Sequence, residues 1–211
     1  MSNYKGCCGE DYPQHEEQSR DERCRPPHPP YPPHPKDFPV TILSCGNGAG
    51  ASLPTNNLAL NGGAAQAVIG SNGSACQTVG TVTLDTHELE HPEVKIDFSS
   101  LINFRANFLS GYTLRLVFQL SRSCDHGGKT TLATWTYEKE ADVYLNGLSI
   151  PSEVEVEFEF KDPFGFVWCL CNDCPGCCLY TVEVVDIYAY GIEGLSITNV
   201  GLTAIASGKP R

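Results

Sequence analysis

The sequence predicts an all-β protein, a jelly-roll-like antiparallel β-sandwich with an extended, proline-rich N-terminal connector. Two observations lead to this prediction. Several segments after residue 39 alternate apolar and polar side chains with period two, and nine of the fifteen prolines lie within the first 39 of the 211 residues. We therefore expect a connector at 1–39, a sandwich domain at 40–207 and a short tail at 208–211.

The connector contains the run Arg25–Pro39, RPPHPPYPPHPKDFP. Proline fixes φ and has no backbone N–H, so this run is incompatible with helix and sheet. It predicts a polyproline II spacer of about 45 Å at ~3.1 Å per residue. The alternative use of such a run is as a ligand for an SH3 or WW domain.

The domain shows its strands as alternating segments. In Tyr112–Leu120, four apolar side chains share one face, and in Glu153–Phe160 (EVEVEFEF) Val154, Val156, Phe158 and Phe160 point inward while the glutamates point outward. Further strands are expected at Val40–Cys45, Thr81–Leu84, Glu93–Phe98, Thr181–Tyr190 and Leu195–Ala206. Eight to ten such strands indicate two packed sheets, for which the jelly roll is the commonest eight-stranded form.

The segment Thr131–Tyr137, TLATWTY, carries no charge. A sandwich has open sheet edges, and an uncharged edge pairs readily with another chain. In a polymer subunit, this pairing would join neighbouring subunits.

The strongest chemical signal is Cys169–Cys178, CLCNDCPGCC, which contains Cys169, Cys171, Cys174, Cys177 and Cys178. Its thiolates could hold zinc or an iron–sulfur cluster. The competing interpretation is a disulfide-stapled loop at the tip of a hairpin that joins Glu153–Phe160 to Leu179–Val185. Phe164, Phe166 and Trp168 would then form an apolar patch at the base of the loop, available to a neighbouring subunit. We favour disulfides and expect no metal and no cofactor.

Cys7, Cys8 and Cys24 lie in the connector. Adjacent cysteines such as Cys7 and Cys8 seldom bond to each other, because the ring that would form strains the peptide. With a spacer behind them, their partners can lie on another subunit. An odd cysteine count also leaves at least one thiol free or bonded to another chain. We therefore expect inter-subunit disulfides through the connector, while Cys76 and Cys124 receive no role.

The segment His87–His91, HELEH, matches the zinc-protease motif H-E-x-x-H, which acts by placing two imidazoles on one face of a helix. Here a strand precedes the motif directly and Pro92 follows it, which disfavours helical angles at His91. We therefore interpret it as a polar connection between strands. No nucleophile, base and orienting group occur in a recognisable arrangement, so we expect no enzyme and no small-molecule substrate.

Charge and hydropathy exclude other partners. The net charge is −11 and no basic cluster occurs, which argues against nucleic acid and anionic lipid. No run approaches the ~18 apolar residues of a membrane-spanning helix, and the N-terminal segment lacks the apolar core of a signal peptide. Eleven cysteines are nevertheless dense for a reduced compartment, so either the cysteines bind metal or the protein leaves the cell by a route other than signal-directed export.

The layout of the whole chain, with Cys7-Cys8, a proline-rich spacer and a sandwich opening on VTILSCG, resembles the subunits of endospore appendages and related domains of anaerobic spore formers. The resemblance implies a self-assembling, extracellular fibre on the spore or cell surface, made in the mother cell without a signal peptide. It also implies that Cys7 and Cys8 bond to acceptors on other subunits, namely Cys45 and either Cys178 or a neighbour from Cys169 onward. The alternative from the residues is a cysteine-rich metal-binding or redox module.

Overall fold

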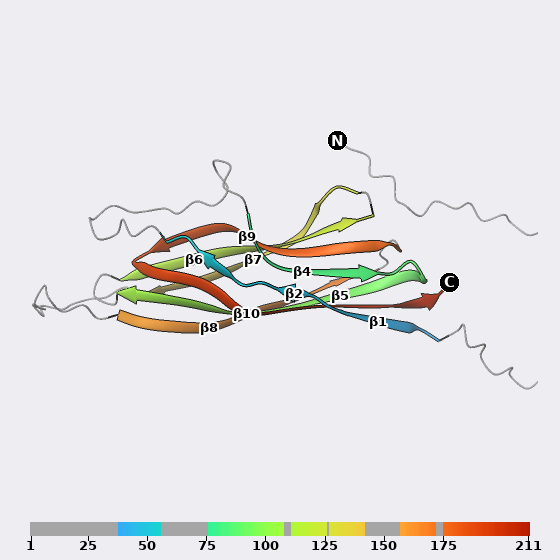
Figure 1. Cartoon of the computed structure of the whole chain (residues 1–211), viewed down its shortest axis with the longest axis horizontal. Coiled ribbons are helices and arrows are strands. Elements are labelled where there is room, and N and C mark those ends of the chain that lie inside the picture. Colours follow the sequence, from blue (N-terminus) through green and yellow to red (C-terminus); the bar gives the residue numbers. More distant parts are fainter. Residues whose placement is uncertain (1–37, 56–75, 108–110, 126, 142–156, 172–174) are drawn as a thin grey trace, which may run out of the picture.

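The structure is a computed structural model, and it describes residues 38–55, 76–107, 111–125, 127–141, 157–171 and 175–211. All regular elements of these residues are strands, which form two layers (Figure 1). The strands are β1 (Val40–Cys45), β2 (Asn47–Gly48), β3 (Ala51–Leu53), β4 (Gln77–Asp85), β5 (Leu89–Asn107), β6 (Tyr112–Cys124), β7 (Thr130–Ala141), β8 (Glu157–Leu170), β9 (Cys177–Tyr190) and β10 (Ile192–Pro210).

The strand order is that of a jelly roll. Sheet A has the order β1-β10-β5-β8, with β3 also paired to β10, and sheet B has the order β2-β4-β9-β6-β7. When β1 to β3 are taken as one interrupted edge strand, eight strands remain. The first pairs with the last, the second with the seventh, the third with the sixth and the fourth with the fifth, all antiparallel. This nested pairing confirms the predicted β-sandwich.

The core lies between the two sheets and follows the alternation of the sequence. Leu114, Leu116, Phe118 and Leu120 of β6 are completely buried, as their pattern predicted. They face the buried side chains of sheet A, of which Ile96, Ile102 and Phe104 are among the largest. Apolar burial of this extent is the main force that holds two sheets together.

Side chains close the sandwich where β7 and β8 lie at the edges of the two sheets. The ring of Trp135 stacks on that of Phe166, with centroids 3.7 Å apart and planes inclined by 7°. Tyr137 donates its hydroxyl hydrogen to Asp162 Oδ2 at 2.7 Å, and Lys139 forms an ion pair with the same carboxylate. On the opposite side the chain itself bridges the sheets, because β1 pairs with β10 and β2 then pairs with β4.

Two expectations about the segments that form β8 and β9 are wrong. β8 belongs to sheet A and β9 to sheet B, so the two do not form a hairpin. Phe166 is only 8% exposed and, like Phe164 and Trp168, packs on the core rather than forming a patch for a neighbour. Each aromatic pairs with rings of the facing sheet or of β5, which a pattern within one strand cannot indicate.

Strand boundaries also differ from those expected. β10 continues to Pro210, so residues 208–210 belong to sheet A rather than to a tail. Phe158 was expected to point into the core, but it lies near the end of the sheet and is exposed. Of the other predicted inward positions of its segment, Phe160 packs against the core, as expected, whereas Val154 and Val156 lie outside the described residues. Thr131–Tyr137 falls within β7, which is an edge strand of sheet B.

The packing of Phe118 makes a stability test possible. Its ring contacts Phe98 and Phe164 across the interface, at centroid distances of 6.0 and 4.5 Å. Phe118→Ala should lower the free energy of unfolding by about 3–5 kcal/mol, because it removes buried area and leaves a cavity. Leu179→Ala, at an exposed position of sheet B, should change it by less than about 0.5 kcal/mol. Urea denaturation measures both, and a similar loss in the two variants would contradict this account of the core.

Candidate disulfide and assembly site

A disulfide joins Cys124, at the end of β6, to Cys178, near the start of β9. The two residues are 54 positions apart in sequence but directly opposite each other in sheet B. Cys178 is 3% exposed, and both side chains point toward the core side of the sheet, beside Tyr180. The bond therefore locks two neighbouring strands at one end of the sandwich.

This bond corrects the expectation for Cys178. A sulfur bonded within its own chain cannot at the same time accept a connector cysteine, as the resemblance implied for this position. Cys124, which had received no role, is its partner. The disulfide also spans two strands instead of closing the loop between Cys169 and Cys178, so the expected stapling within the cluster is not what ties Cys178.

Five described cysteines carry free thiols. Cys45, Cys76, Cys169 and Cys171 are exposed, and Cys177 is partly buried. The other predicted cysteines, Cys7, Cys8, Cys24 and Cys174, lie outside the described residues. Free thiols that face solvent are open to bond formation with another chain, which buried ones are not.

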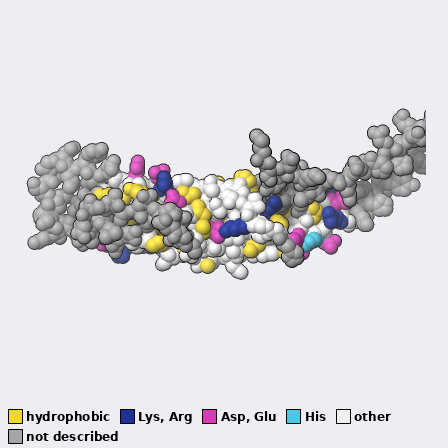
Figure 2. All heavy atoms as spheres, turned by 90° about the horizontal axis from the view of Figure 1, so that it is seen from above, with side chains coloured by type: hydrophobic (Ala, Val, Ile, Leu, Met, Phe, Trp, Pro, Cys, Tyr) yellow, Lys and Arg dark blue, Asp and Glu magenta, His cyan; other side chains and the backbone are white. Residues whose placement is uncertain are grey.

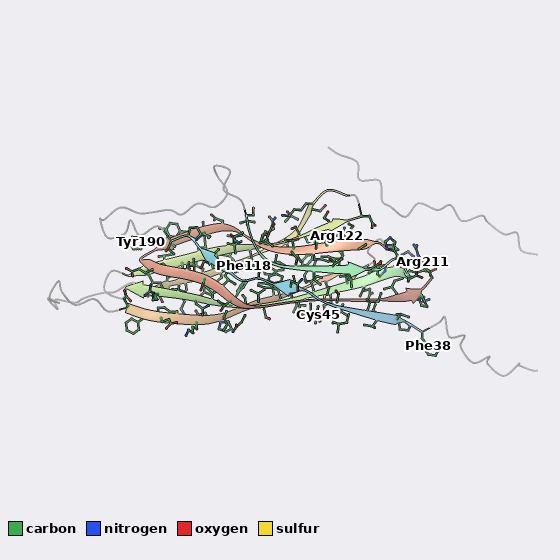
Figure 3. All side chains as sticks on the ribbon, in the orientation of Figure 1. Phe38, Cys45, Phe118, Arg122, Tyr190 and Arg211 are labelled. Atoms are coloured by element: carbon green, nitrogen blue, oxygen red, sulfur yellow. A yellow bond between two sulfur atoms is a disulfide. The ribbon has the colours of Figure 1, made fainter. Side chains whose placement is uncertain are left out.

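Cys45 and Cys169 lie on the outer face of sheet A. Cys45, which is labelled in Figure 3, ends β1 opposite Thr203 of β10, and Cys169 lies on β8 opposite Lys95 of β5. These two strands form the opposite edges of the sheet. Three strand spacings separate them, about 14 Å, so Cys45 and Cys169 cannot bond to each other within one chain.

Cys177 is held at one end of the sandwich by hydrogen bonds between loops. Its backbone N–H donates to Asp125 Oδ1 at 3.2 Å, and the Asp125 N–H donates to its carbonyl at 2.9 Å. Next to it, the Thr86 N–H and hydroxyl both donate to the Gly176 carbonyl, while the Gly176 N–H donates to Thr86 Oγ1. The segment that leads into β9 is therefore fixed to the turns after β4 and β6.

The connector joins the sandwich at the same end. β1 begins at Val40, which pairs with Gly208 near the end of β10, and Figure 3 shows Phe38 and Arg211 close to this end. The Arg211 N–H donates to the Glu88 carbonyl in the turn that precedes β5. The chain thus enters the sandwich where β8 ends and β9 begins, which is where Cys169, Cys171 and Cys177 lie.

The HELEH segment is a turn followed by a strand. His87 lies in the turn after β4, Leu89 begins β5 and is buried, and His91 lies in β5 with a φ of 47°. The two imidazoles therefore do not share a helical face, which agrees with the expected connection between strands. Among the described residues, no group of three or more His, Cys, Asp or Glu side chains is placed to hold a metal ion.

His87 instead contacts two acidic side chains at this end of the sandwich. Its Nδ1 lies 2.7 Å from Asp85 Oδ1, and its Nε2 lies 3.9 Å from Asp125 Oδ1. The hydrogen bond to Asp85 raises the pKa of His87, and the hydrogen bonds from the His87 backbone and ring lower the pKa of Asp85. Figure 2 shows acidic side chains around a histidine near one end, with the basic side chains of that face scattered among acidic ones.

A shallow hollow of about 570 Å³ crosses the outer face of sheet A. Its floor is a row of small residues on three adjacent strands, Gly201, Ser99 and Gly165, and Val167 stands beside it. A Cβ at Gly165 would come within 2.6 Å of the Phe98 carbonyl oxygen, so this position accepts only glycine without a backbone shift. The hollow is open, and Asp97 is the one charged residue among the described residues that line it.

The fold and the site define a class of protein: a jelly-roll β-sandwich with exposed thiols on one face and at the end where its N-terminal segment enters. The chain belongs to the family described as "domain of unknown function (DUF4489)", whose model matches residues 39–207. The match begins one residue before β1 and ends within β10. A search of the curated proteins found no match. None of the described residues form a helix long and apolar enough to cross a membrane.

The disulfide leads to a direct prediction. Cys124→Val combined with Cys178→Val should lower the free energy of unfolding by about 2–4 kcal/mol, because the unfolded chain loses a cross-link that closes a loop of this length. Cys45→Ser, which changes an exposed and unbonded thiol, should leave stability within about 0.5 kcal/mol. Urea denaturation without reductant measures both. Mass spectrometry of unreduced peptides should show Cys124 linked to Cys178, and free thiols at both positions would contradict the assignment.

The His87 contact predicts a pH dependence. Because the pKa of His87 is raised, its contribution to stability is present below the unfolded value and disappears as pH rises through the folded value. The lowered pKa of Asp85 adds a contribution that is lost as pH falls through its folded value. The pair is therefore complete between about pH 4 and 6.5. Asp85→Asn should lower the pKa of His87 in an NMR titration, whereas Glu93→Gln should not; equal values in the three proteins would refute the contact.

Proposed function

We propose that the chain is a structural subunit that self-assembles into an extracellular fibre on the spore or cell surface, with inter-subunit disulfides formed through the N-terminal connector. The observation that supports this most is the position of the free thiols. Cys169, Cys171 and Cys177 lie where the connector joins the sandwich, and Cys45 lies on the first strand after it. Within the described residues, these thiols have no partner in their own chain.

The length of the connector favours partners on other subunits. Cys24 precedes Phe38 by 14 residues, which span about 43 Å as polyproline II. In the predicted polyproline II conformation, the spacer would hold Cys24 away from the thiols of its own domain, and Cys7 and Cys8 precede Cys24 in the sequence. A second subunit can bring its Cys45, Cys169, Cys171 or Cys177 to these connector thiols. Each disulfide forms as two thiols give up two protons and two electrons to an oxidant such as dioxygen.

The disulfide within the domain supports an oxidising location. Cys124 and Cys178 are bonded at the end of the sandwich, and such bonds persist outside the reducing cytosol. Assembly of a fibre in the mother cell, followed by exposure on the spore, would place the chain in such an oxidising exterior. In this proposal the subunit has no catalytic role, no cofactor and no small-molecule substrate, and its partner is a second copy of itself.

The alternative, a metal-binding or redox module, rests on the same thiols. Cys169, Cys171 and Cys177 are unbonded and come from neighbouring ends of β8 and β9. Cys178 is no longer available as a ligand, since it is bonded to Cys124. Elemental analysis of the purified protein separates the two functions: stoichiometric zinc or iron would favour the module, and a metal-free polymer would favour the fibre.

The proposal predicts a redox-dependent polymer. On unreduced denaturing gels, the wild-type chain should give a ladder or material that fails to enter the gel, and reductant should collapse it to one band near 22.9 kDa. Cys7→Ser with Cys8→Ser and Cys24→Ser should abolish the ladder, because the connector then has no thiol to donate. Cys76→Ser is the matched control and should retain it. Wild-type chain that runs as a monomer without reductant would overturn the proposal.

A further inference from the structure

Among the described residues, sheet A has two open edges, and the first is unusually unprotected. β1 pairs only with β10, so one side of its backbone has no partner strand in the described part of the chain. Its six residues, VTILSC, contain no charge and no proline. Leu43 is 62% exposed and Val40 is 42% exposed. Natural edge strands are normally blunted by charge, proline or a cover, because a bare edge pairs with another chain.

The second open edge, β8, is protected over only part of its length. Its first half carries Glu157, Glu159 and Lys161, followed by Pro163, which cannot donate a ladder hydrogen bond. Its last six residues, Gly165–Leu170, contain neither charge nor proline. Within this stretch Val167 points outward and is 56% exposed. Sheet A therefore has an uncharged stretch of six residues at each edge.

The edges of sheet B are less suited to continue a sheet. On one side β2 already pairs with Gly80 and Thr81 of β4. On the other side β7 carries Glu138, Lys139 and Glu140 in one half and exposed threonines in the other. No described residue of β7 is a large hydrophobic side chain that stands exposed. Sheet A is therefore the sheet that offers an uncharged, apolar edge strand on each side for pairing between copies.

Strand direction makes these two edges compatible. Three successive antiparallel pairings separate β1 from β8, so the two strands run in opposite directions. When a second copy is placed beside the first in the plane of the sheet, its β8 lies antiparallel to β1 without any reversal of the molecule. An antiparallel pair of this kind exchanges backbone hydrogen bonds along its length.

We propose that β1 of one copy pairs with the end of β8 of the next copy, which extends sheet A from subunit to subunit. Val40–Cys45 pairs with Gly165–Leu170, and Leu43 lies opposite Val167. This register keeps Ile42 opposite Trp168, and both residues face the core side of the sheet. Registers shifted by one residue would put these apolar side chains on opposite faces, so only shifts of two are alternatives.

The interface is heterologous, because two different edges meet. Such a contact does not close on itself unless the rotation between copies completes a ring, and it otherwise produces an open-ended assembly. The inference rests on the proposed self-assembly and adds the surfaces that meet. It is separate from the connector disulfides, which would join copies covalently once the sheet edges have set their positions.

The test introduces charges at the two exposed positions in the full-length chain. Leu43→Lys alone and Val167→Glu alone should each raise the concentration needed for sedimentable polymer by up to about fivefold, because each places a charge opposite an apolar side chain and removes the apolar cross-strand contact. The double variant should recover wild-type assembly, since the new charges lie opposite each other. The same Leu43→Lys with Val167→Lys should not recover it. Leu179→Lys, on sheet B, is the matched control and should assemble normally.

Single variants that assemble like wild type, or a double variant without recovery, would overturn the inference. Disruption by Thr134→Lys alone would assign the contact to β7 instead. A second measurement does not depend on polymer formation. With Thr41→Cys, the new thiol should bond to Cys169 of another copy, because the proposed register places these positions opposite each other. A peptide linked between positions 41 and 169 supports the edge contact even if no fibre forms, and its absence after oxidation rejects the contact.

Discussion

Burial of apolar side chains between the two sheets holds the sandwich together, and it gives each strand one face for the core and one for solvent. This division determines which of the described strand cysteines form a disulfide and which stay exposed. Cys178 lies on the core side of β9, where Cys124 is directly opposite and forms a disulfide with it. Cys45 and Cys169 lie on the solvent side of sheet A, at opposite edges, and remain free. The same packing that builds the core therefore separates structural from accessible thiols.

The end of the sandwich near Cys177 gathers features that are distant in sequence. The turn after β4, the turn after β6 and the approach to β9 are joined by the hydrogen bonds of Thr86 with Gly176 and of Asp125 with Cys177. The Cys124–Cys178 bond ties β6 to β9 at the same place. Because β1 and β10 also meet there, the connector enters next to a rigid, disulfide-bonded platform. A rigid surface of this kind loses little entropy when another chain bonds to it.

In the proposed assembly, sheet edges and thiols make two different contributions. A β-strand contact sets direction and register through backbone hydrogen bonds, whereas a disulfide adds permanence without specifying geometry over a long distance. Sheet A has an even number of strands along its main path, so its two edges run antiparallel and are suited to repeated addition of identical copies. In sheet B, β2 pairs with part of β4 and charges line part of β7. In our proposal, copies are therefore added along sheet A rather than along sheet B.

The sequence alone was sufficient for the fold class and for the inward face of strands such as Leu114–Leu120, because period-two alternation is a local property of the chain. It also indicated correctly that HELEH is no helix, from the adjacent strand and Pro92. Only the tertiary structure decided that β8 and β9 lie in different sheets, that Phe166 stacks on Trp135, and that Cys124 pairs with Cys178 across 54 residues. These contacts depend on which strands become neighbours, and strand order follows from the packing of the whole sandwich rather than from any local pattern.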